Sequence, residues 1–174
     1  FSTSGSKILY AWAKDAAGNV SSSLNDSVTI TINTSIVYID PTYTGVNGTE
    51  NGTIERPYNA WTDITFQNDM TYLQKKGTTY ASSTQIFVNG RSNITIDTYG
   101  TGVRPLFSYT GGGYAVRIEN SSNITFRGFE VNGNGGAHSL VGVNGTSGSY
   151  TQNVIIDDCE LYNAHNTNNA GFGV

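Results

Sequence analysis

The chain has 174 residues, of which only 13% are charged, and its formal net charge at pH 7 is −4. This acidic balance excludes the basic surface that a nucleic-acid partner requires. No apolar run reaches the roughly 18–20 residues of a membrane span. The single cysteine, Cys159, excludes an internal disulfide, and the 21 glycines favour a β-protein with many turns. Together these features predict an extracellular or cell-surface protein.

The first 34 residues predict a β-hairpin that forms a separate unit. Side chains alternate from Ile8 to Trp12 and again from Val28 to Ile32, and the segment Asp15–Asn19 between them has the composition of a turn. Two strands alone are marginally stable in water. We therefore expect the hairpin to pack on the rest of the chain, to pair with another molecule, or to be a remnant foreign to the fold.

The segment 35–84 predicts a first strand, a polar loop and a short helix over 59–69. Asn59 is a candidate N-cap, and Trp61 and Ile64 begin an apolar stripe at helical spacing. Such a helix would cap the open end of a stacked array of strands, which otherwise exposes a β-edge and apolar side chains.

A repeat dominates the remaining sequence. Three similar sequence segments begin with an asparagine, and these asparagines are 30 residues apart, at Asn93, Asn123 and Asn153 (123 − 93 = 30 and 153 − 123 = 30). Each continues with two-residue apolar alternation, which indicates a strand, and a fixed period of this length indicates stacked units. We predict that the three asparagines form an inward-pointing structural ladder with hydrogen bonds from one unit to the next.

A resemblance to right-handed parallel β-helix proteins of the pectate-lyase-like superfamily is carried by SSNITFRGFEVNGN, TQNVIIDDCELYNAH and, upstream, VYIDPTYTGVNGTENGTIERPYNAW. A second resemblance, to the last two strands of a bacterial immunoglobulin-like repeat, is carried by KILYAWAKDAAGNVS and VTITI. They imply an all-β fold: a right-handed parallel β-helix of about three coils plus the start of a fourth, with a short N-terminal cap helix and an N-terminal β-hairpin. The implied divisions are 1–34, 35–84 and 85–174.

The fold that this resemblance implies hosts lyases, hydrolases, epimerases and adhesins, so it does not define a function. The sequence shows no paired-carboxylate, triad, phosphate-loop or Cys/His metal pattern, and no catalytic residue is predicted. The leading prediction is a structural or adhesive module that assembles with copies of itself through open β-edges into a filament or larger array. The alternatives are a carbohydrate-binding module and the N-terminal part of a secreted lyase or hydrolase acting on an acidic polysaccharide, with its active site beyond Val174.

Candidate binding residues follow from residue type. Candidates for polysaccharide binding are an outward cation and three tyrosines that we expect to be exposed and able to stack on sugar rings, namely Arg117, Tyr109, Tyr114 and Tyr150. His138 and His165 are predicted to be solvated loop residues rather than bases.

Two sets of carboxylate side chains are candidate Ca²⁺ ligands, because Ca²⁺ prefers oxygen ligands. Asp158 and Glu160 lie in the densest acidic stretch, and a polar outer face is the alternative interpretation. A second candidate set comprises three carboxylates of the loop that follows the first strand, Asp40, Glu50 and Glu55. Asn-x-Ser/Thr triplets give possible glycosylation acceptors at Asn47, Asn51 and Asn144, unless they arise from composition alone.

Overall fold

The computed structural model describes residues 5–30, 35–45 and 49–165. The chain divides into two compact units, Phe1–Thr34 and Ser35–Val174, which are described separately below. Among the described residues, no helix is long and apolar enough to cross a membrane.

The smaller unit is an antiparallel pair of strands, β1 (Gly5–Ala11) and β2 (Leu24–Ile30). Its connection is ordered by Asp15, whose carboxylate accepts hydrogen bonds from the side chain and backbone of Asn19 and from the backbone of Ala17 at 2.9–3.0 Å. The hydrogen bonds from Asn19 hold the pKa of Asp15 below its usual value. Tyr10 and Trp12 are stacked at 6.0 Å between ring centroids but remain exposed.

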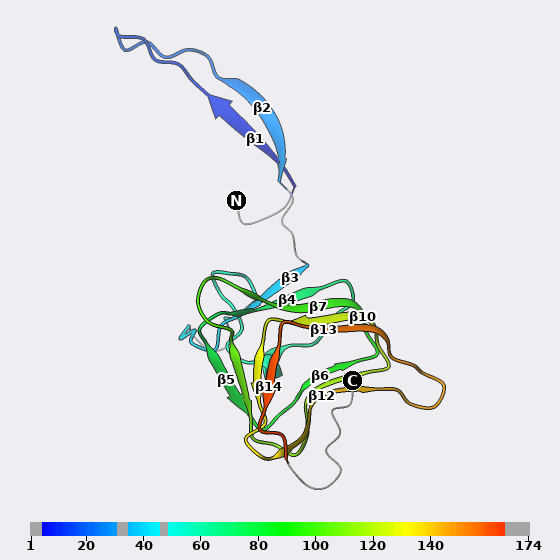
Figure 1. The fold of residues 1–174 in the computed structure, drawn as a ribbon. Coiled ribbons are helices and arrows are strands. Elements are labelled where there is room, and N and C mark those ends of the chain that lie inside the picture. Colours follow the sequence, from blue (N-terminus) through cyan, green and yellow to red (C-terminus); the bar gives the residue numbers. More distant parts are fainter. Residues whose placement is uncertain (1–4, 31–34, 46–48, 166–174) are drawn as a thin grey trace. The chain divides into compact units, whose positions relative to one another are not determined.

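The larger unit contains three parallel sheets (Figure 1). The first sheet has the order β13 (Gln152–Asp157), β10 (Ser122–Arg127), β7 (Ser92–Tyr99), β4 (Thr71–Lys75) and β3 (Ile36–Ile39). The second has the order β14 (Glu160–Tyr162), β11 (Glu130–Asn132), β8 (Leu106–Tyr109) and β5 (Thr79–Ser82). The third has the order β12 (Ala137–Asn144), β9 (Gly113–Glu119) and β6 (Ile86–Asn89).

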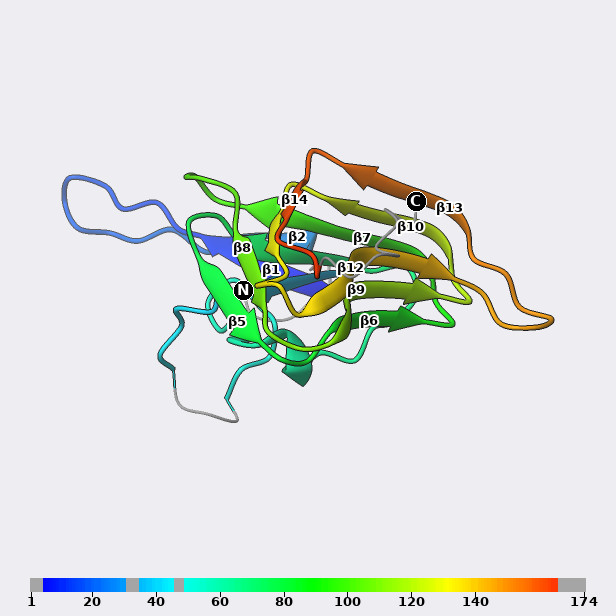
Figure 2. The same ribbon diagram turned by 60° about the horizontal axis from the view of Figure 1, so that its bottom comes forward.

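From β4 onward the chain visits the first, second and third sheets in rotation. Each circuit therefore lays a new strand beside its predecessor in every sheet, as Figure 2 shows for β7, β10 and β13. Ile94, Ile124 and Val154 are direct register partners in the first sheet. Because side chains alternate between faces along a strand, this register stacks the same inward positions from circuit to circuit.

The core lies inside the three sheets and is rich in aromatic side chains. Phe126 and Phe129 are fully buried and stacked, with ring centroids 4.8 Å apart. The buried amide of Gln74 is satisfied, because Trp61 Nε1 donates to its oxygen at 2.6 Å and its nitrogen donates to Thr78 Oγ1 at 3.3 Å. Buried polar groups are tolerated when they are paired in this way.

The structure corrects the predicted cap helix over 59–69. The described residues contain no α-helix, and this segment has only a 3₁₀ turn, η1 (Trp61–Asp63). Ala60 precedes the turn with extended backbone and no side-chain cap, and Ile64 is extended directly after it. Trp61 and Phe66 both enter the core, but residues five apart do not share a helical face, so their burial requires non-helical backbone.

The prediction of a right-handed parallel β-helix is also wrong. The larger unit is all-β, as predicted, but its strands are hydrogen-bonded in three separate parallel sheets rather than in a clear β-helix. The sequence pattern reports strand alternation and period, and both are compatible with more than one arrangement of strands into sheets.

Replacing Phe126 by alanine tests the core. We expect Phe126→Ala to lower the free energy of unfolding by about 3–5 kcal/mol, because it removes a fully buried ring and leaves a cavity. Urea denaturation followed by the fluorescence of Trp61, with Trp12 replaced by phenylalanine, measures this loss. Thr125→Ala, on the opposite face of β10, should change stability by no more than about 0.5 kcal/mol. Equal losses in the two variants would contradict the assigned faces.

Candidate functional site

A column of left-handed residues marks the start of the first-sheet strands. Asp69, Asn93, Asn123 and Asn153 have φ angles of 60°, 57°, 56° and 55°. Asn153 donates to Asn123 at 3.0 Å, Asn123 to Asn93 at 2.9 Å, and Asn93 to Asp69 at 2.7 Å, in each case from Nδ2 to Oδ1. We call these four residues the asparagine column. The structure thus brings together the three asparagines of the predicted ladder.

Two features of the column differ from the prediction. Its asparagines are exposed rather than turned inward, whereas the following residue, Ile94 in the first case, is buried. The column also begins at Asp69, which the sequence pattern missed because it lies 24 rather than 30 residues before Asn93. Asparagine and aspartate tolerate positive φ better than other non-glycine residues, which explains their use at this corner.

Substitutions of Asn123 separate the contribution of its side-chain hydrogen bonds from that of its left-handed backbone conformation. Asn123→Gly keeps the left-handed backbone and removes two side-chain hydrogen bonds, which we expect to cost about 1–2 kcal/mol of stability. Asn123→Ala also places a β-carbon in the left-handed region, which costs about 1 kcal/mol more. Chemical denaturation of both variants measures the difference. An alanine variant as stable as the glycine variant would show that the backbone conformation imposes no cost.

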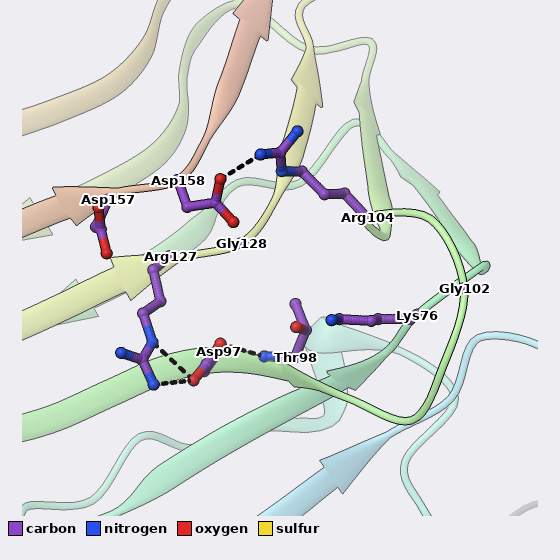
Figure 3. Close-up of a pocket in the computed structure, with 9 residues that line it drawn as sticks. All are labelled: Lys76, Asp97, Thr98, Gly102, Arg104, Arg127, Gly128, Asp157 and Asp158. Carbon is purple, nitrogen blue, oxygen red and sulfur yellow. Dashed lines mark hydrogen bonds and ion pairs between the residues drawn. The ribbon is translucent and has the colours of Figure 1, made fainter.

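A cleft of about 380 Å³ runs along the corners between the first and second sheets (Figure 3). Its lining comes from four successive corners and the strands that lead into them: Lys76, Asp97, Thr98, Gly102, Arg104, Arg127, Gly128, Asp157 and Asp158. We call it the charged cleft. Three cationic and three carboxylate side chains line it, so its formal charges balance.

Two ion pairs cross the charged cleft. Arg127 binds Asp97 through Nη2 at 2.6 Å and Nε at 2.8 Å. Arg104 Nη2 is paired with Asp158 Oδ1. These hydrogen bonds raise the pKa of both guanidinium groups above their usual value, so they remain charged.

A close approach of the backbone shapes the floor of the cleft. Gly128 has a φ of 79°, and a β-carbon there would lie 3.3 Å from the side chain of Thr98. The neighbouring Asp97 carboxylate is oriented by the backbone N–H of Thr98 at 2.8 Å. Glycine at this corner therefore keeps Asp97 and Thr98 open to the cleft.

Two charged groups in the cleft lack a direct hydrogen-bond or ion-pair partner, although the carboxylate of Asp157 also helps to raise the pKa of Arg127. In the part of the chain that the structure describes, the side chains of Lys76 and Asp157 make no hydrogen bond or ion pair, and Figure 3 shows both lining the cleft. Lys76 offers an ammonium donor, Asp157 a carboxylate acceptor and Thr98 a hydroxyl group. The cleft can therefore donate and accept hydrogen bonds to a polar ligand that carries both kinds of group.

The third sheet holds the predicted carbohydrate-binding residues Arg117 and Tyr114. The Arg117 guanidinium lies 5.0 Å from the ring centroid of Phe87 and 5.4 Å from that of Tyr114, and it pairs with the buried carboxylate of Glu119. Tyr114 lies over Gly142, where any β-carbon would collide with the ring. These cation–π contacts occupy the faces that a sugar would need.

The other two tyrosines lie in different environments. Tyr109 is buried against Phe107 and its hydroxyl donates to Gly112 O at 2.7 Å, so the prediction of an exposed ring is wrong. Burial raises its pKa. Tyr150 is 82% exposed and remains available for stacking.

The candidate Ca²⁺ ligands are partly engaged elsewhere. Asp158 is paired with Arg104, and Glu160 is the register partner of Glu130. Asp40 binds Lys75 Nζ at 2.7 Å and Thr42 Oγ1 at 2.6 Å. Burial of Asp40 opposes ionisation, but these hydrogen bonds outweigh it and lower the pKa of its carboxyl group. Within residues 5–30, 35–45 and 49–165, no group of three or more His, Cys, Asp or Glu side chains is placed to hold a metal ion.

The possible glycosylation acceptors differ in how accessible their amide nitrogens are. Asn51 is exposed and accepts hydrogen bonds from Thr53 at 2.9 and 3.2 Å, which leaves its amide nitrogen accessible. The amide nitrogen of Asn144 is buried, so this acceptor is blocked in the folded protein. Asn47 lies outside the described residues.

Sequence reasoning missed the charged cleft as a cluster, although a signal was present. Asp97, Arg127 and Asp157 have the same spacing as the asparagines (127 − 97 = 30 and 157 − 127 = 30). Arg127 and Asp157 are register partners across β10 and β13, and the Arg127 side chain pairs with Asp97 of β7. The contributions of Lys76 and Arg104 come from turns of unequal length, which carry no periodic signal.

The fold and cleft define an all-β protein with three parallel sheets and a polar groove along their corners. No protein-family model and no curated protein matches the sequence. Among solved structures, the chain is similar to the selenomethionine derivative of GH136 lacto-N-biosidase from Eubacterium ramulus, with a TM-score of 0.57 and 11% identity. The match covers 76% of this chain and 27% of that chain, so this chain spans about a quarter of that enzyme's length. At this identity the similarity concerns the fold.

Proposed function

We propose that the chain is part of a carbohydrate-active protein and that the charged cleft binds a saccharide. The observation that carries the proposal is the pair of unpaired groups, Lys76 and Asp157, in a cleft that also presents the Thr98 hydroxyl. Sugar hydroxyls both donate and accept hydrogen bonds, so they match such a mixed lining. The fold similarity to a glycoside hydrolase supports the same class of ligand.

The charge balance favours an uncharged saccharide over an acidic one. Binding a row of uronate carboxylates would require free cations, but Arg104 and Arg127 are already paired with Asp158 and Asp97. The remaining ammonium of Lys76 is offset by the carboxylate of Asp157. An anionic chain would therefore meet as many repulsive as attractive groups.

Removing either unpaired group should weaken saccharide binding. We expect Lys76→Ala and Asp157→Ala each to lower affinity about tenfold or more, because a hydrogen bond to a charged group contributes about 1.5–3 kcal/mol. A glycan array containing neutral oligosaccharides and polyuronates identifies the ligand, and calorimetry with that ligand measures the affinities.

Glu55→Gln is the matched control, because it removes an exposed charge outside the cleft. Its affinity should equal that of the unaltered chain. Binding that survives both cleft substitutions would reject the cleft as the site. A preference for polyuronates over neutral sugars would reject the argument from charge balance.

A structural module that assembles through its β-edges is the second candidate. The observation that favours it is β13, which ends the first sheet with one edge unpaired among the described residues. Beside it lies a shallow depression of about 490 Å³, lined by Val143 and by side chains of β13 that include the exposed Ile155. An unpaired edge with apolar neighbours is a template for pairing with a second copy.

A lysine on this edge tests assembly. If β13 pairs with a second copy, Ile155→Lys should abolish the association, because a charge would be buried at the new interface. Thr125→Lys is the control, since Thr125 is the register partner of Ile155 but lies on an inner strand. Sedimentation velocity and negative-stain electron microscopy give the oligomeric state. A chain that remains monomeric at high concentration would reject this candidate.

A further inference from the structure

Two histidines that lie 27 residues apart in the sequence meet on the surface of the larger unit. His138 belongs to β12, and the backbone N–H of His165 donates to Ala137 O at 2.6 Å, which places His165 beside the start of that strand. The two imidazole rings have centroids 5.8 Å apart and an interplanar angle of 38°. These are the only histidines in the chain.

The tautomer of His165 is fixed by its surroundings. Its Nδ1 lies 2.6 Å from Gly135 O, and a carbonyl oxygen can only accept, so Nδ1 carries the proton. Neutral His165 therefore presents an unprotonated Nε2 with a free lone pair. A hydrogen bond from one ring nitrogen to a carbonyl is the arrangement that orients metal-ligating histidines.

The neighbouring His138 is placed so that its imidazole could act as a second metal ligand. It is exposed, and its ring makes no hydrogen bond among the described residues, so either nitrogen can turn toward His165. Metal–imidazole bonds are about 2.0–2.1 Å long, so two rings on one ion have centroids about 5 Å apart. The observed separation of 5.8 Å is close to this value.

We propose that His138 and His165 form a two-histidine chelating site for a divalent transition metal ion. The site supplies two protein ligands, and water completes the coordination, which makes the ion exchangeable. Imidazole nitrogen selects transition ions over Ca²⁺ and Mg²⁺, and affinity should follow the order Cu²⁺ above Ni²⁺ and Zn²⁺. The bound ion would join the segment after β14 to β12 and so hold the last described circuit closed.

The test is a titration of the full chain, without a histidine tag, with Zn²⁺ and Ni²⁺ by calorimetry, and with Cu²⁺ by NMR. We expect one ion per chain, and Cu²⁺ should broaden the ring signals of both histidines at the same added concentration. His138→Ala should lower affinity about 100-fold, because the second bond of a chelate forms intramolecularly.

His165→Asn is the second variant, because its amide can keep the hydrogen bond to Gly135 O while removing the Nε2 ligand. It should lose metal affinity to the same extent and retain its thermal stability without metal. Cys159→Ser controls for the thiol and should bind normally. Two ions per chain, single variants that each keep one site at full strength, or loss of binding in the cysteine variant would overturn the proposal.

Discussion

The asparagine column is the constraint on which the larger unit depends. Asn93 and Asn123 each accept from the next circuit and donate to the previous one, whereas Asp69 only accepts and Asn153 only donates. These hydrogen bonds fix the register of β7, β10 and β13 relative to one another. A slip of one residue would turn Ile124 and Phe126 outward and expose the aromatic core. The column begins at Asp69, a carboxylate that accepts from Asn93, so all the amides point in the same direction along it.

The same register builds the charged cleft. Asp97, Arg127 and Asp157 lie on adjacent strands with alternating charge, which avoids the like-charge contacts that destabilise a sheet. The Arg127 side chain is 50% exposed, and such surface pairs contribute only about 0–1 kcal/mol to stability. The row is therefore better suited to contacting a ligand than to holding the fold. By contrast, the carboxylate of Glu119 is covered, and Arg117 is enclosed between two rings.

The sequence predicted the structure best where the same residue type recurs at the same position of each repeat. The alternating runs form strands, and the repeating asparagines meet, because period and alternation are local properties that register preserves. The predicted cap helix is absent because Trp61 packs against Phe129 and donates to Gln74, and local spacing does not encode contacts with such distant residues. Tyr109 was misplaced because a tyrosine hydroxyl can be satisfied by a nearby carbonyl and then buried. His138 lies in β12 rather than in a loop as predicted, and it meets His165 only because the chain returns to the start of that strand, a long-range contact that the local sequence does not encode.

The proposed saccharide binding and glycosidic bond cleavage would make different demands on the cleft. Glycoside hydrolysis commonly needs two carboxyl groups, one to donate a proton and one to act as nucleophile or base. In the described part of the cleft, the oxygens of Asp97 and Asp158 face guanidinium donors, and Asp157 is the carboxylate that a substrate would find free. Hydrolysis in this cleft would therefore require a second free carboxyl group brought from elsewhere in the protein. Binding has no such requirement, since one acceptor, one ammonium and one hydroxyl suffice to orient a sugar ring.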